Sequence, residues 1–146
     1  MSALTEHAVR FARHRRLLNP DTAYGQCVIQ TDALLDNVPS AHAIRVTGLN
    51  YPGREHWAAV EWSDDGDADP SEFTVVDLTA RQFDATIAVP WIGTLADWLD
   101  LTVDWLADHV NVEVHRAATH DAPVWTEEYA SRDDVEEAAE PMRAWA

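Results

Sequence analysis

Lysine is missing from the sequence, and all ten basic residues are arginine. Cysteine is nearly missing too. With Cys27 alone no disulfide can form within the chain, so we expect a cytoplasmic protein, in a virion or host cytoplasm if a phage encodes it. No apolar run approaches the ~20 residues that span a bilayer, and the N-terminus lacks the apolar segment and cleavage site of a signal peptide. These absences exclude a disulfide-stabilised secreted fold and predict no membrane partner.

Charge is strongly one-sided, with 26 acidic residues and a formal net charge of −16. The first 16 residues hold four Arg and one Glu and so carry +3, which leaves −19 on residues 17–146. A surface this acidic repels phosphate backbones, so nucleic acid is not expected as a partner except through the N-terminal segment. Adaptation to high salt (a halophilic protein) and GC-rich coding bias both explain the acidity. A third interpretation is that the acidic surface mimics DNA to block a DNA-binding protein.

The apolar residues, 47% of the chain, recur with helical or alternating spacing between turn-forming segments. We expect helices at 3–18, 27–36 and 94–108 and strands at 42–50, 56–62, 73–79 and 110–115. Together they predict an α+β fold in which the N-terminal helices pack on a small antiparallel sheet. Residues 1–126 form a single domain in this interpretation, beginning with an Arg-rich helix at 1–18, and residues 127–146 form an acidic peripheral helix or tail.

Four residues carry more local expectations. Thr94 is a natural N-cap for the helix that follows it, and Gly48 is a candidate bulge within a strand. Trp98 and Leu106 have the spacing of one apolar helix face. We therefore interpret both as core residues.

Cys27 is the best candidate for a catalytic group. It follows a Tyr-Gly-Gln turn and opens an amphipathic helix, where backbone N–H groups stabilise a thiolate, the nucleophilic form of cysteine. Gly25 would let the chain approach a substrate closely, and Gln26 would offer an amide donor to an oxyanion. The other interpretation is that Cys27 is a packing residue, as lone cysteines usually are.

A thiolate nucleophile needs a general base, and the base needs a group that orients it. His56 stands at the start of a predicted strand, and Asp77 interrupts another apolar strand, where a carboxylate is costly without a partner. If residue 60 or residue 62 pairs with residue 73 in an antiparallel hairpin, His56 and Asp77 lie directly opposite or diagonal on one face. We expect the helix that carries the thiol to pack on that same face.

The order and context of these residues resemble the papain-like cysteine hydrolases. Within that superfamily they are most similar to the small bacterial and phage papain-fold toxins and protein-glutamine deamidases. The segments that carry the likeness are Gly25-Gln26-Cys27, His56-Trp57 and Val75-Val76-Asp77-Leu78-Thr79. The resemblance covers roughly residues 20–90 of the chain, and it implies a papain-like fold.

The activity implied by this resemblance is hydrolysis of an amide or ester carbonyl, by a peptidase, a glutamine deamidase or an acyl transferase. Cys27 would be the nucleophile, His56 the general base and acid, and Asp77 the orienting group. A protein or peptide is the expected substrate, and no cofactor is expected. The candidate oxyanion or substrate-binding residues are Gln26, Gly25, Trp57 and Gln82.

Other chemistries have weaker support. No metal site is predicted, because His109, His115 and His120 lack the spacing of a known ligand set. The acidic loop 64–69 lacks the closing Glu of a calcium loop. The chief alternative function is a non-enzymatic acidic binding or inhibitor protein, virus- or plasmid-encoded, with Cys27 as a core residue. The sequence does not determine the oligomeric state.

We expect salt to stabilise the fold. The −19 charge on residues 17–146 repels itself at low ionic strength, and salt screens that repulsion beyond a Debye length of ~10 Å at 0.1 M. The melting temperature, followed by circular dichroism, should therefore rise between low-salt buffer and molar NaCl. A flat or falling curve would show that the acidic groups are spaced widely enough to tolerate one another, and the high-salt interpretation would lose its main support.

Overall fold

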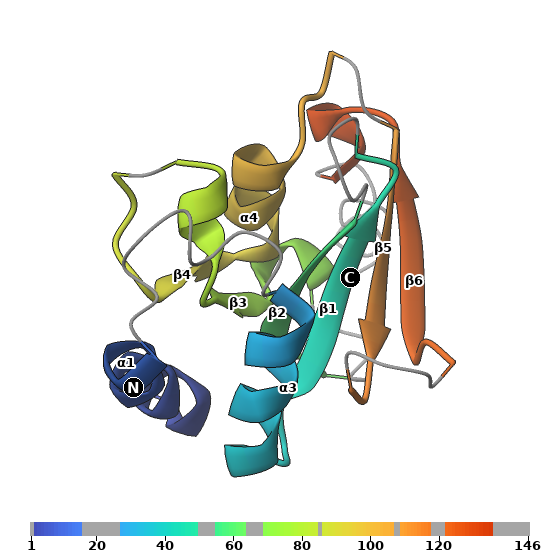
Figure 1. Cartoon of the computed structure of the whole chain (residues 1–146). Helices are drawn as coiled ribbons and strands as arrows, with labels where there is room; N and C mark the ends of the chain where they lie inside the picture. The colour runs from blue at the N-terminus through green and yellow to red at the C-terminus, as the bar shows by residue number, and fades with distance from the viewer. Residues whose placement is uncertain are drawn as a thin grey trace.

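The computed structural model describes residues 2–15, 27–49, 55–63, 69–84, 86–106, 109–117 and 122–135. Its strands form one sheet in which all neighbours are antiparallel, in the order β4-β3-β2-β1-β5-β6 (Figure 1). The strands are β1 (His42–Thr47), β2 (Glu55–Glu61), β3 (Thr74–Asp77), β4 (Trp91–Thr94), β5 (Val110–His115) and β6 (Trp125–Tyr129). The described helices are α1 (Ala3–Arg15), α3 (Cys27–Asn37) and α4 (Leu95–Thr102), with 3-10 turns η1 (Pro70–Glu72) and η2 (Ala80–Gln82).

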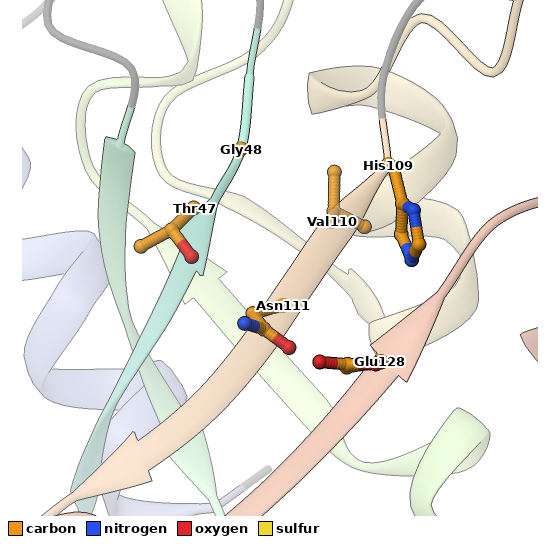
Figure 2. Close-up of a pocket in the computed structure, with 6 residues that line it drawn as sticks. All are labelled: Thr47, Gly48, His109, Val110, Asn111 and Glu128. Atoms are coloured by element: carbon orange, nitrogen blue, oxygen red, sulfur yellow. The ribbon is translucent and has the colours of Figure 1, made fainter.

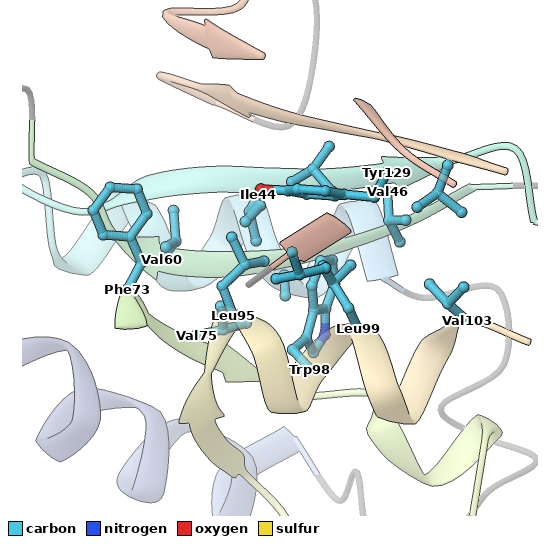
Figure 3. Packing of buried hydrophobic residues seen from close by; sticks show 14 of the residues in the cluster. Ile44, Val46, Val60, Phe73, Val75, Leu95, Trp98, Leu99, Val103 and Tyr129 are labelled. Carbon is cyan, nitrogen blue, oxygen red and sulfur yellow. The ribbon is translucent and has the colours of Figure 1, made fainter. Parts of the chain in front are cut away.

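The predicted α+β class is confirmed, with the N-terminal helices packed on an antiparallel sheet. Alternation along the strands gives this sheet two apolar faces, because successive side chains point to opposite sides. One face packs against α4, as Figure 3 shows, and its cluster includes Ile44, Val60, Val75, Leu95, Trp98 and Leu99. The other face packs against α1 and α3, and its cluster includes Leu4, Ala8, Leu34, Ala43, Trp57 and Ala59. None of the described helices has the length and apolar composition needed to cross a lipid bilayer.

Helix α4 begins where the sequence predicts and ends earlier. Thr94 caps it, since the Thr94 hydroxyl accepts a hydrogen bond from the Asp97 N–H at 3.1 Å. The helix ends at Thr102, because Val103 adopts an extended backbone (φ −106, ψ 133) from which its side chain still reaches the core. The expected continuation to residue 108 is therefore wrong, and Leu106, expected in the core, is fully exposed.

Two strands were not predicted, and both lie at the edges of the sheet. β4 is short and follows a proline, and β6 is rich in polar residues, as edge strands often are. The boundary expected between residues 126 and 127 falls inside β6, which pairs with β5 along its whole length. Tyr129 and Val135 are buried in the core, so the peripheral segment does not start at residue 127. Residues 136–146 of that segment, and residues 16–18 of the expected first helix, lie outside the described residues.

Gly48 does not form the expected bulge. β1 ends at Thr47, and Gly48 follows with φ +87, a left-handed conformation that favours glycine. A Cβ atom at this position would lie 2.3 Å from the carbonyl oxygen of His109. Glycine is thus required twice here, by the turn of the backbone and by the close approach of the segment that leads into β5.

Gly48→Ala should destabilise the fold by about 2 kcal/mol or more, because the left-handed backbone alone costs an alanine roughly 1–2 kcal/mol and the carbonyl clash adds to it. Urea unfolding monitored by tryptophan fluorescence measures the change. Asp36→Ala, at an exposed position of α3, is the matched control and should stay within about 0.5 kcal/mol of wild type. Equal midpoints for Gly48→Ala and wild type would contradict the close approach.

Candidate active site

The pairing of β2 with β3 brings His56 and Asp77 together. Ala59 pairs with Val76 and Val60 with Val75, and the same register places residue 62 opposite residue 73. This is one of the two registers that the sequence allowed, and it makes His56 and Asp77 diagonal neighbours on one face. His56 Nε2 lies 2.6 Å from Asp77 Oδ2. The predicted contact between the two side chains is confirmed.

The Asp77 carboxylate has further donors on two residues, Trp98 and Thr79. Its Oδ2 also accepts a hydrogen bond from Trp98 Nε1 of α4 at 2.8 Å, and its Oδ1 accepts one from the backbone N–H of Thr79 at 2.9 Å. Asp77 is fully buried, where an unpaired carboxylate would be very costly. The three donor residues come from β2, from α4 and from the turn after β3, so the carboxylate ties these elements together.

Two aromatic rings enclose the His56 imidazole. Phe83 meets it edge-on, with the ring centroids 4.7 Å apart and an interplanar angle of 86°. The Trp98 ring lies on another side at 5.9 Å with a tilt of 33°. His56 is fully buried, so its orientation is set by these rings and by Asp77 rather than by solvent.

The electrostatics of the pair favour a charged imidazole. Burial alone would lower the pKa of His56, but the Asp77 charge, the Asp77 hydrogen bond and the contact with Cys27 together raise it to about 9. Burial alone would raise the pKa of Asp77, but the His56 charge and the hydrogen bonds from His56, Trp98 and Thr79 hold it below its ordinary value. Since an ionised carboxylate only accepts hydrogen bonds, His56 Nε2 carries the proton of this bond.

Cys27 is the first residue of α3, as the sequence predicts, and it is half-buried. Its side chain interacts with the His56 ring, and this interaction contributes to the raised pKa of His56. The helix does not pack where we expected it. The face that carries His56 is covered by α4, whereas α3 packs on the opposite face, in the cluster that contains Ala43 and Trp57.

Of the remaining predicted site residues, Trp57 alone has a described side chain, and it does not lie beside the His56 ring. Trp57 follows His56 in β2, so strand alternation sends its ring to the opposite face, where it is buried beside Arg45 and His115. The Trp57 ring therefore does not lie next to the His56 imidazole. Gly25, Gln26 and the side chain of Gln82 lie outside the described residues, and their roles stay predictions.

The histidines considered as metal ligands lie apart from one another where they are described. His115 Nε2 contacts Glu113 Oε1 at 3.0 Å, and His109 is exposed beyond the start of β5. Within the described ranges no three His, Cys, Asp or Glu side chains gather into a possible metal-binding group. His120 is outside those ranges.

Sequence reasoning missed three contributors to the site: Trp98, Phe83 and Thr79. Trp98 was interpreted only as a core residue, and it is one, being fully buried against the sheet. A buried indole N–H nevertheless needs an acceptor, and Asp77 is a buried carboxylate that needs donors. This need of a donor for an acceptor was the signal that could have paired Trp98 with Asp77. Residue spacing alone, however, does not show that α4 covers the face on which Asp77 lies.

No protein-family model matches the chain. No curated protein matches its sequence. Among solved structures, it is similar to the catalytic domain of the Salmonella virulence factor SseI, with a TM-score of 0.44 and 12% sequence identity. The match covers 92% of this chain and 76% of that one. This likeness is distant, and it assigns no role to any residue of this chain.

The free energy of unfolding should fall as the pH rises from about 6.5 to about 9. In the unfolded chain His56 loses its proton near the ordinary histidine pKa of 6.5, whereas the folded chain keeps it to about 9. Within this window the folded state binds more protons, so rising pH favours unfolding, by about 3 kcal/mol over the full shift. Urea titrations at several pH values measure the slope, and His56→Gln should remove that part of it. An unchanged slope in His56→Gln would assign the pH dependence to other groups.

Proposed function

We propose that the chain is a cysteine hydrolase that acts on an amide or ester carbonyl through Cys27, His56 and Asp77. The observation that carries the proposal is the buried His56–Asp77 pair, joined at 2.6 Å, and the interaction of the Cys27 side chain with the same ring supports it. A thiol, an imidazole and a carboxylate in series form the relay that activates a cysteine nucleophile. The papain-like resemblance of the sequence assigns the same three residues to the same roles.

The first half-reaction forms an acyl-enzyme. Because Asp77 occupies His56 Nε2, Nδ1 is the nitrogen that is left to exchange a proton with the thiol. The thiolate attacks the carbonyl carbon, and the tetrahedral intermediate collapses as the leaving amine or alcohol takes the proton from the imidazolium. Cys27 is then bound to the acyl group as a thioester, and His56 is neutral. The N–H groups at the start of α3 are suitably placed to favour negative charge on sulfur before this attack.

The second half-reaction releases the product. Neutral His56 takes a proton from a water molecule as its oxygen attacks the thioester carbon, and the intermediate expels the Cys27 thiolate. The acid is released, and the imidazolium that remains again faces Asp77. An amine or alcohol in place of water gives acyl transfer, and a glutamine side chain in place of a peptide gives deamidation. These outcomes share one site, and the substrate decides among them.

Cys27 should react with iodoacetamide in the native protein at neutral pH, and the reaction should depend on the residues behind it. His56→Ala should slow the alkylation about tenfold or more, because the thiolate loses its counter-ion. Asp77→Asn should slow it less, because an amide still faces the ring but carries no charge. Mass spectrometry follows the reaction without ambiguity, since Cys27 is the sole thiol of the chain.

Trp98→Phe tests whether the indole donor matters beyond its packing. It removes the hydrogen bond to Asp77 and keeps an aromatic ring, so alkylation should slow by a smaller factor, about threefold. Trp105→Phe is the matched control, since it removes an indole hydrogen bond to the exposed Asp100 away from the site. If Cys27 reacts only in denaturant, it is a packing residue and the hydrolase proposal is wrong. If every variant reacts like wild type, His56 and Asp77 do not act on the thiol and the proposal is wrong as well.

A further inference from the structure

A row of polar side chains crosses the sheet next to the candidate active site. Glu128 of β6 pairs with Asn111 of β5, Asn111 pairs with Thr47 of β1, and Thr47 pairs with Glu55 of β2. Residues that pair across antiparallel strands share a face, so the four side chains stand side by side at one level of the sheet. Strand alternation places this row on the face opposite His56, the face on which α3 carries Cys27. The row runs from β2, beside the strand position of the candidate base, to the edge strand β6.

The far part of this row lines a pocket of about 280 Å³. Its walls are Thr47, Gly48, His109, Val110, Asn111 and Glu128, as Figure 2 shows. The side-chain oxygen of Asn111 and a carboxylate oxygen of Glu128 are turned toward one another across it. Both side chains are exposed, and the Asn111 amide can turn either its oxygen or its NH2 group toward a ligand held at Glu128.

The polar groups of this pocket differ from those of the neighbouring network. One step along the strands, Arg45 bonds to both Glu55 and Glu113, and His115 contacts Glu113, so both of these carboxylates have partners within the protein. Within the part of the chain that the structure describes, the side chains of Asn111 and Glu128 have no hydrogen bond or ion pair. No basic residue other than His109 lines the pocket. Its chemistry calls for a positively charged donor.

We propose that this pocket binds the cationic side chain, guanidinium or ammonium, of an extended peptide substrate. The proposal rests on the hydrolase function above, for which it names the substrate class. Glu128 would supply the charge, and Asn111 and Thr47 would supply further acceptor oxygens. A net charge of −16 over the chain attracts such a peptide from a distance as well.

The spacing between the pocket and β2, the strand that α3 and its Cys27 pack against, sets where the basic residue sits in the peptide. Glu55 and Glu128 are three strands apart, which corresponds to roughly 14 Å at the ~4.8 Å spacing of neighbouring strands. An extended peptide advances ~3.3 Å per residue, so this distance corresponds to about four residues. The basic side chain therefore lies within about four residues of the carbonyl that Cys27 attacks.

Binding is tested by NMR with a minimal probe, N-acetyl-arginine amide, and its uncharged isostere, N-acetyl-citrulline amide. The arginine probe should cause saturable shifts of the amide signals of Thr47, Gly48, Val110 and Asn111, and citrulline should not. Glu128→Gln should weaken the arginine affinity about fivefold, the upper range for a partly exposed ion pair. Glu72→Gln, which removes one exposed acid elsewhere, is the matched control and should bind like wild type.

Equal shifts with citrulline, shifts that map outside the pocket, or an unchanged affinity in Glu128→Gln would overturn the proposal. Because this measurement does not involve Cys27, its failure is distinct from a failure of the hydrolase function, which the alkylation rates report.

A second experiment joins the pocket to the thiol. Peptides with an N-terminal chloroacetyl group alkylate Cys27 by displacement of chloride by the thiolate, which gives a thioether. Arginine placed one to four residues from that group should accelerate the reaction over citrulline at one position of the series, and Glu128→Gln should abolish the difference. Equal rates for arginine and citrulline at all positions would show that the pocket does not act on substrates of this site.

Discussion

The buried carboxylate of Asp77 is the constraint on which the site depends. It has no contact with solvent and accepts hydrogen bonds from His56, Trp98 and the backbone of Thr79. A buried ion of this kind is tolerated only when several donors surround it, and removal of one partner typically costs about 3–5 kcal/mol. The register of β2 on β3, the position of α4 and the turn after β3 must therefore all be correct together.

This arrangement makes packing and chemistry inseparable at Trp98. The same side chain fills the apolar cluster between α4 and the sheet and donates to Asp77, so α4 cannot shift without disturbing His56. A slip of one residue between β2 and β3 would move His56 to the opposite face and leave Asp77 without its ion-pair partner. The pair thus selects one register among those that the apolar residues alone would allow.

The sequence predicted those parts of the site for which its residue pattern allows one arrangement only. A period of two fixes which side chains share a face, so the contact of His56 with Asp77 followed from parity and from the cost of a carboxylate in an apolar strand. Periodicity does not say which helix covers which face. For that reason α3 was assigned to the wrong side, and Trp98 was taken as packing alone. The polar edge strand β6 was missed because pairing with β5, rather than burial, makes it a strand.

Helices α3 and α4 contribute different groups to the site. α4 holds the base from one face, through Trp98, while α3 brings the thiol from the other. α3 packs on β1 and β2, and on the same face Asn111 of β5 and Glu128 of β6 are exposed. A substrate that reaches Cys27 at the start of α3 would extend toward these two residues. There Arg45 pairs with both Glu55 and Glu113, whereas Glu128 has no ion pair among the described residues. What distinguishes Glu128 from other acidic residues of the chain is its position, because it lines a pocket at the same level of the sheet as the start of β2.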